Sequence, residues 1–185
     1  MKRLFSVLGL VGAITLISPY LAAKPDPKKG DKGGSRSELR ATLRGIEEVP
    51  SIVTQAEGQF HARISDDKTT IAYELMYEDF ATDVLASHIH VGQRGVSGAV
   101  VAFLCGGGGK PTCPLRSGTV NGTITQADII TVPAQEITGT PAESFAKVIE
   151  AIGAGVAYVN VHSAAHPGGE IRGQIRAHHH GHDKE

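Results

Sequence analysis

Short segments in which apolar and polar residues alternate recur along most of this chain. The segment ELRATLRG, residues 38–45, and the segment GQFHARIS, residues 58–65, both show the pattern. Their apolar positions are Leu39, Ala41, Leu43, Phe60, Ala62 and Ile64. A repeat of two is the side-chain period of a β-strand, so each segment turns one face towards a core and the other towards solvent.

Six further β-rich segments follow, separated by turn signals: TTIAYELMYE, VLASHIHV, AVVAFLC, RSGTVNGTI, GVAYVNVHS and GEIRGQIRA. About eight short strands with frequent turns predict an all-β protein, an antiparallel β-sandwich of the Greek-key or immunoglobulin-like type. The apolar run AVVAFL, residues 99–104, indicates a strand buried on both faces. We expect a single domain over residues 38–177, which is long enough to enclose a sizeable core.

One helix interrupts the strands, at about residues 141–152. Thr140 is a suitable N-cap, Pro141 suits the first helical position, and Glu143 completes a capping box. Four apolar residues recur at helical spacing and predict one buried face: Phe145, Val148, Ile149 and Ile152. We expect this helix to end at one of the glycines that follow and to cross the open end of the sandwich.

The two ends of the chain have the composition of processing and tail segments. A basic start, an apolar run over residues 4–17 and small residues before a cut after Ala23 predict a signal peptide over residues 1–23. Residues 24–37 are rich in Pro, Gly and Lys and predict a disordered linker. Residues 178–185 form a His-rich tail, predicted to be disordered and able to bind metals loosely. The mature protein is therefore expected to be secreted or periplasmic, without a transmembrane segment.

Charge argues against nucleic acid as a partner. Removal of residues 1–23 changes the formal charge from −1 to −3, because that segment contains Lys2 and Arg3 but no acidic residue. Nucleic-acid binding relies on clustered Lys and Arg that neutralise phosphates. The mildly acidic net charge of the mature chain therefore argues against nonspecific binding of nucleic acid.

Cys105 and Cys113 are the two cysteines, in LCGGGGKPTCP. In an exported chain a close pair most simply forms a disulfide, which would close a glycine-rich loop. Metal binding by the two thiols is the alternative. A phosphate-binding loop is excluded because Lys110 is followed by Pro111, where the motif requires Ser or Thr. Asn121-Gly122-Thr123 is either a glycosylation acceptor, in a eukaryotic source, or a tight turn, and the turn is favoured.

Three late segments present polar side chains on one side. In VLASHIHV, Leu85, Ile89 and Val91 are expected on one face, with His88 and His90 on the other. The opposite-face residues of the last two segments are Tyr158, Asn160, His162, Glu170, Arg172, Gln174 and Arg176. If these strands are neighbours, the three histidines gather with Glu170 and Arg172.

Such a cluster supports two interpretations. Two imidazoles at i and i+2 and a third from a neighbouring strand form a ligand set for copper or zinc with an open position, so His88, His90 and His162 are candidate ligands. Glu170, Arg172, Asn160 and Tyr158 would then orient them. The competing interpretation is a structural network of hydrogen bonds and ion pairs, since His-x-His on a strand is often only a polar stripe. The sequence shows no known catalytic motif, so we predict no catalytic residues.

Three stretches resemble the successive motifs of the CHRD domain, which is named for its occurrence in chordin and is also found alone in exported microbial proteins. They are LRGIEEVPSIVTQAEGQFHARISDDKTTIAYELMYEDF, SHIHVGQRGVSGAVVAFLC and YVNVHSAAHPGGEIRGQI. The resemblance covers about residues 38–177 and is most specific at Glu48-Val49-Pro50, at the His-x-His-x-Gly strand end, and from His162 to Gly173. It implies no catalytic activity, and it places the histidines, Glu170 and Arg172 on motif positions.

The sequence thus predicts a non-catalytic binding or structural module of the cell envelope or extracellular space, with an extracellular or periplasmic protein or a small ligand as partner. The loops at about 92–98 and 163–169 are the expected contact regions. The alternative is a copper- or zinc-binding protein, either redox-active or not. The His-x-His strand is similar in arrangement to that of copper-zinc superoxide dismutase. That enzyme needs further histidines and an Asp for its zinc, and none can be assigned here.

Overall fold

The computed structural model describes residues 38–178, so the predicted signal peptide, the linker and all of the His-rich tail beyond His178 lie outside the described residues. The strands are β1 (Glu38–Arg44), β2 (Glu57–Ile64), β3 (Thr70–Glu78), β4 (Val84–Val91), β5 (Ala99–Cys105), β6 (Gly118–Thr125), β7 (Ala157–Ser163), β8 (Ile171–Gln174) and β9 (Arg176–His178). The helices are α1 (Pro141–Gly153) and three short 3₁₀ turns, η1 (Gly45–Glu47), η2 (Gln126–Asp128) and η3 (Pro133–Gln135). The last predicted strand is divided at Ile175 into β8 and β9, so residues 38–178 contain nine strands where about eight were predicted.

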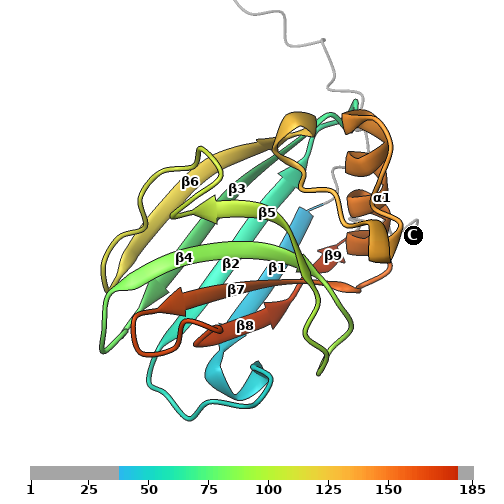
Figure 1. Ribbon diagram of the computed structural model, residues 1–185. Helices are drawn as coiled ribbons and strands as arrows, with labels where there is room; N and C mark the ends of the chain where they lie inside the picture. The colour runs from blue at the N-terminus through green and yellow to red at the C-terminus, as the bar shows by residue number, and fades with distance from the viewer. Residues whose placement is uncertain (1–37, 179–185) are drawn as a thin grey trace, which may run out of the picture. The chain divides into compact units, whose positions relative to one another are not determined.

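All strand pairs are antiparallel, in the order β5-β4-β7-β8-β1-β2-β3-β6, with β9 pairing with β1. The two halves of this order form the two layers of a sandwich, which are joined where β8 pairs with β1 at Arg172 and Arg44 (Figure 1). The chain crosses between the layers after β3, after β5, after β6 and after β8, and such crossings are usual in Greek-key sandwiches. The predicted all-β antiparallel sandwich is confirmed.

The core lies between the layers and consists of the residues that alternation assigned to it. Leu39, Leu43 and Phe60 are no more than 1% exposed, and their polar neighbours in the strands face outwards. β5 is less buried than its apolar sequence suggests, because Ala99, Val100 and Phe103 are only partly covered. Phe103 lies instead against His88, with a ring-centroid distance of 4.5 Å.

Alternation is wrong at Leu85, which is 51% exposed rather than buried. The pairing of β4 with β7 shifts register between Val84 and Ala86. A bulge of this kind changes which residues point inwards, and Val84, 4% exposed, enters the core in place of Leu85.

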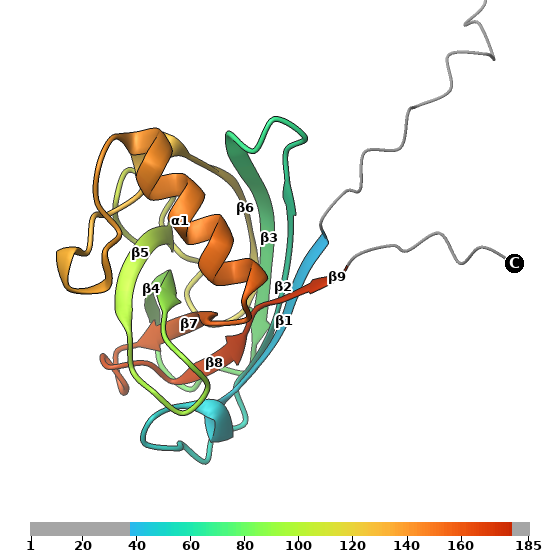
Figure 2. The ribbon, with the colours of Figure 1, turned by 90° about the vertical axis from the view of Figure 1, so that its right-hand side faces the viewer.

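Helix α1 begins and ends as predicted. The Thr140 hydroxyl accepts a hydrogen bond from the Glu143 backbone N–H, and the Glu143 carboxylate accepts one from the Thr140 backbone N–H. Phe145, Val148 and Ile152 are 1% exposed and enter the core. Figure 2 shows α1 lying across the open side between the two layers, where it delivers the chain from β6 to β7.

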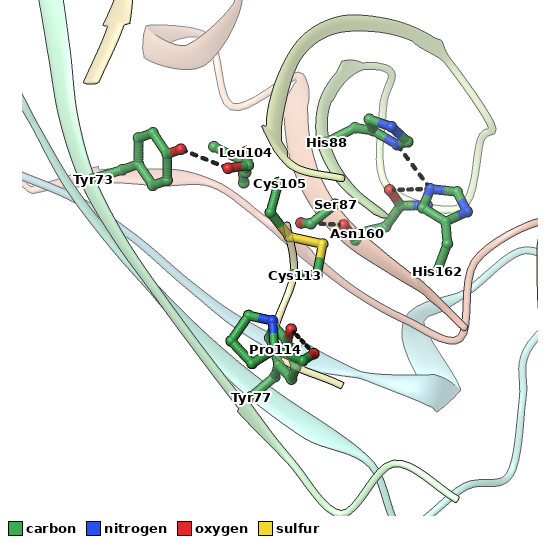
Figure 3. Close-up of a disulfide and its surroundings, with 10 residues drawn as sticks. All are labelled: Tyr73, Tyr77, Ser87, His88, Leu104, Cys105, Cys113, Pro114, Asn160 and His162. Atoms are coloured by element: carbon green, nitrogen blue, oxygen red, sulfur yellow. Dashed lines mark hydrogen bonds between the residues drawn. A yellow bond between two sulfur atoms is a disulfide. The ribbon is translucent and has the colours of Figure 1, made fainter. Parts of the chain in front are cut away.

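Asn121 and Gly122 lie inside β6, so the predicted tight turn is wrong. Gly122 is paired in register with Tyr73 of β3. A Cβ at position 122 would lie 2.4 Å from the Tyr73 Oη, which donates a 2.6 Å hydrogen bond to the Leu104 carbonyl (Figure 3). The glycine is therefore required by the neighbouring tyrosine ring and not by a turn.

Replacement of Gly122 by alanine is expected to lower the free energy of unfolding by about 1 to 3 kcal/mol, since an extra methyl group in a packed site forces neighbours out of position. Urea denaturation followed by circular dichroism measures the change. Gly168→Ala is the matched control, because a Cβ at that position meets no atom within 4 Å. Equal stability of the two variants would contradict this account of Gly122.

Cys105 and Cys113 form a disulfide, as predicted, and both are nearly fully buried (Figure 3). The bond closes the glycine-rich loop that follows β5, and it excludes the alternative in which free thiols bind a metal. A disulfide fits an exported protein, because such bonds persist in oxidising compartments. Within residues 38–178 no helix is both long enough and apolar enough to span a membrane.

Candidate metal centre

Two neighbouring strands hold the three histidines on the outward side of the sheet. β4 carries His88 and His90, β7 carries His162, and in the register of this pair His88 lies opposite Asn160 and Ala86 opposite His162. The ring centroids of His88 and His162 are 4.7 Å apart, those of His88 and His90 5.6 Å, and those of His90 and His162 6.3 Å. The structure thus brings together the three imidazoles that the sequence placed on one side.

Although the rings face outwards, their surroundings cover them. His88 and His90 are 9% and 7% exposed. The Phe103 ring meets His88 edge to face, and the Tyr158 ring stacks on His90 with a centroid distance of 4.8 Å and an interplanar angle of 7°. Aromatic side chains therefore cover His88 and His90, whereas His162 is only partly buried.

Backbone carbonyls determine the tautomers of two of the three imidazoles. The Nδ1 of His90 lies 3.0 Å from the Gly98 carbonyl oxygen, and the Nδ1 of His162 lies 2.9 Å from the Pro167 carbonyl oxygen. A carbonyl oxygen can only accept, so both Nδ1 atoms carry a proton and donate. In the neutral rings the lone pair is then on Nε2 in both cases.

These lone pairs differ in their surroundings. The Nε2 of His162 is 2.9 Å from the Nδ1 of His88, which donates to it when Nδ1 carries the proton of that ring (Figure 3). It is also 2.9 Å from the Oδ1 of Asn160, which has no proton to donate. The Nε2 of His90 is buried without a hydrogen-bond partner. One potential ligand atom from each histidine can be chosen so that all three lie within 4.8 Å of one another.

The pKa values of all three histidines are lowered, which keeps the rings neutral and their lone pairs available. Burial is the main cause in each case. For His88, burial together with the neighbouring His162 and His90 lowers the pKa to about 3. Neutral imidazole is the form that binds a metal ion.

Glu48 belongs to the same region and was not among the predicted site residues. It is 7% exposed, and its Oε1 has no hydrogen-bond partner. Asn160 lies close enough to affect the pKa of both Glu48 and His90, but it reaches hydrogen-bond geometry with neither orphan atom. A Cβ added to Gly169 would lie 2.6 Å from Glu48 Oε1 and 2.8 Å from Asn160 Nδ2. The sequence contained a signal for Glu48, because this residue opens the Glu48-Val49-Pro50 motif.

Tyr158 and Arg172 form the wall next to His90. The guanidinium carbon of Arg172 lies 3.7 Å from the centroid of the Tyr158 ring, and its Nη2 donates to the carbonyls of Gln93 and Val96. Burial raises the pKa of Glu48, and the charge of Arg172 opposes that rise. Among the described residues, Glu48 is the carboxyl that offsets the charge of Arg172.

The sequence left two roles open for Glu170, as a residue that orients the imidazoles or as part of a structural network, and its contacts are of the second kind. It is 2% exposed and accepts hydrogen bonds from Thr54, at 2.7 Å, and from Ser163. It thereby joins the loop before β2 to the end of β7, and it makes no hydrogen bond to any of the three imidazoles. Glu170 is a structural link beside the site.

The loop over residues 92–98 is attached to the site at its last residue as well as at the two carbonyls that Arg172 binds. The N–H of Gly98 donates to the Tyr158 hydroxyl at 3.1 Å, while its carbonyl accepts from His90. A Cβ at Gly98 would lie 1.8 Å from the Val91 carbonyl oxygen. Only glycine allows the approach that supplies this carbonyl to the imidazole.

The other histidines of the described region stay apart. His61 lies on the outer face of β2, and His166 lies in the turn after β7, as its proline and glycine neighbours suggested. Residues 38–178 contain a single group of three ligand-type side chains close enough to share an ion, namely His88, His90 and His162. A second metal site of the dismutase kind is not found among them.

A sequence model of the CHRD domain matches residues 39–175, which is most of the chain and includes every residue of the site. This chain belongs to the CHRD family. The predicted resemblance is confirmed, and the CHRD domain spans β1 to the end of β8. Comparison with curated proteins and with solved structures gives no match.

The most specific CHRD motifs of this chain contain the residues of the site. The His-x-His-x-Gly strand end supplies two of the imidazoles, the Glu48 corner supplies an unpaired carboxyl oxygen, and the closing stretch from His162 supplies the third imidazole, Glu170 and Arg172. Segments that are far apart in the CHRD sequence therefore meet at one place.

Proposed function

We propose that this CHRD domain is an exported binding module that holds one divalent copper or zinc ion on His88, His90 and His162. The observation that carries the proposal is the buried Nε2 of His90, which has no partner while its Nδ1 is held by a carbonyl. Metal-binding histidines commonly donate their other N–H to a carbonyl or carboxylate, which aims the lone pair at the ion.

The spacing of the nitrogens supports an ion in this place. At a metal–nitrogen distance of about 2.0 to 2.1 Å, two ligands lie about 2.9 Å apart at the right angle of square-planar copper and about 3.3 to 3.4 Å apart at the tetrahedral angle of zinc. His88 Nδ1 and His162 Nε2 are 2.9 Å apart. All three ligand atoms lie within 4.8 Å of one another, so small shifts of the rings bring them to one ion. Three imidazoles would leave a coordination position open, and Asn160 Oδ1 lies 2.9 Å from one of the ligand nitrogens, His162 Nε2.

The structural-network interpretation explains less. A hydrogen-bonded network pairs its buried polar atoms, because an unpaired one costs about 1 to 3 kcal/mol. Here two buried atoms near Asn160, Glu48 Oε1 and His90 Nε2, are unpaired. A cation held by the three imidazoles would give the His90 lone pair a partner.

Metal analysis tests the proposal directly. In the full chain, the tail histidines are first replaced by asparagine, so that only the domain is measured; they are His178, His179, His180 and His182. After incubation with Zn²⁺ or Cu²⁺ and extensive dialysis, elemental analysis is expected to find one ion per chain. The double variant His88→Ala, His90→Ala is expected to retain less than about a tenth of that amount, because a single imidazole binds such ions weakly.

His61→Ala together with His166→Ala is the matched control and is expected to retain the ion. Wild-type protein that stays folded and metal-free after this treatment would exclude the proposal. The domain would then be assigned to the second candidate, a module that binds a partner through its loops.

That second candidate has an observation of its own. The turn after β1 and the loop over 92–98 expose large apolar side chains, with Val53 95%, Ile46 61% and Val96 50% exposed. The two loops are joined by an ion pair between Arg94 and Glu47, at 3.4 Å. Exposed apolar residues that gather on linked loops are typical of interaction sites.

A further inference from the structure

A basic groove runs along the outer face of β1 and β2, and none of His88, His90 and His162 lines it. It has a volume of about 510 Å³ and is lined by Arg40, Arg44, Arg94, Arg176 and His61, among others. Its only acidic lining residue among those described is Glu47. The groove therefore carries a local positive charge, whereas the whole chain has a formal charge of −1.

The strand register concentrates these arginines. Arg40 and Arg44 are outward positions of β1, and Arg176 of β9 is the direct cross-strand partner of Arg40. Like charges placed opposite each other across a sheet destabilise it. Their juxtaposition is a cost that a bound anion would remove.

Two of the arginines have no side-chain partner within residues 38–178. Arg40 pairs with Glu38 at 2.9 Å, and Arg94 pairs with Glu47. No ion pair or side-chain hydrogen bond is found for Arg44 or for Arg176. Their guanidinium groups are free to receive a planar anion such as a carboxylate or a sulfate, which matches the fork of donors.

The shape of the groove indicates a chain rather than a compact ligand. Arg40 and His61 also line an adjoining hollow of about 420 Å³, which contains Arg63 and the acidic residues Glu38 and Glu74 as well. Arg94 and Arg176 also line another hollow, of about 480 Å³. The three hollows share residues and so follow one another along the surface. A linear polymer can occupy such a series of hollows.

The backbone beneath the groove argues against a peptide. β1 is paired with β2 on one side and with β8 and β9 on the other, so its backbone groups are not available to an added strand. Recognition must use the pendant groups of the polymer. Thr42 and Gln59, which are exposed in the groove, can bind hydroxyl groups beside the arginines.

We propose that this groove binds a linear acidic polysaccharide, one with carboxylate or sulfate groups along its length, with Arg44 and Arg176 as the principal anion contacts. This site is separate from the proposed metal centre. It does not depend on the metal ion.

Fluorescence anisotropy with labelled polygalacturonate and labelled dextran sulfate tests the proposal on the full chain. We expect saturable binding that weakens as salt is raised, because exposed charges are screened. The double variant Arg44→Gln, Arg176→Gln is expected to bind at least about tenfold more weakly, since hydrogen bonds to charged groups are stronger than neutral ones. Preference for one of the two polymers distinguishes carboxylate from sulfate recognition.

Arg116→Gln is the control, because it also removes the charge of an arginine. Arg116 lies outside the groove, where it pairs with Asp83. It is expected to leave binding unchanged, and thermal unfolding checks that all variants are folded. Equal loss in Arg116→Gln, no loss in the double variant, or equally tight binding of poly-L-glutamate or single-stranded DNA would overturn the proposal. None of these results affects the metal analysis.

Discussion

Metal-free protein is expected to lose stability steeply between pH 6.5 and pH 3, and His88 is the main reason. Its pKa is lowered from 6.5 to about 3 in the folded state, chiefly by burial. Above pH 6.5 the ring is neutral in both the folded and the unfolded chain, so it contributes no pH dependence. Below pH 6.5 the unfolded chain takes up a proton that the folded site rejects, and the free energy of unfolding falls.

The size of this effect follows from linkage. One group whose pKa is lowered this far costs about 1.4 kcal/mol per pH unit, or about 5 kcal/mol by pH 3. The pKa values of His90 and His162 are lowered as well, and their contributions have the same sign. Urea denaturation at a series of pH values, after treatment with a chelator, measures the slope.

The interval from pH 6.5 to pH 5 is the most informative, because most carboxylates titrate below it. His88→Gln is expected to show a shallower slope there than wild type, and the control His61→Gln an unchanged one. A wild-type slope near zero in this interval would mean that the three imidazoles are solvated in the folded protein.

Replacement of Glu170 by alanine is expected to lower the free energy of unfolding by about 2 to 6 kcal/mol, since each of two buried hydroxyl groups left without its acceptor costs about 1 to 3 kcal/mol. The carboxylate is 2% exposed and accepts from Thr54 and from Ser163, so its loss leaves two hydroxyl groups without their acceptor. Glu170→Gln keeps the shape and one acceptor, and we expect it to cost less than half as much.

Thermal and urea unfolding of the two variants measure this difference. Because Glu170 has no recorded contact with the imidazoles, Glu170→Gln is also expected to retain the ion in the metal analysis. If that variant lost the ion while remaining folded, Glu170 would have to be counted with the site and not with the structural links.

Much of the architecture could be predicted from local chemistry. Alternation is decided by neighbouring residues in the chain, so it identified the buried faces of β1 and β2, and the capping residues identified both ends of α1. It was wrong at Leu85, where a bulge in the pairing of β4 with β7 reverses the inward direction. The Asn121-Gly122 turn signal was wrong for another reason, since Gly122 lies inside β6 and makes room for a tyrosine on another strand.

The candidate site shows the same division. Alternation alone placed His88, His90 and His162 outwards, because the pleat of a strand does not depend on distant residues. Their meeting depends on β4 and β7 being neighbours, and their burial depends on Gly98, Phe103 and the loops around them. The roles of Glu48 and Glu170 arise only when segments more than a hundred residues apart are brought together, since an orphan atom or a shared hydrogen bond is a property of the packed structure.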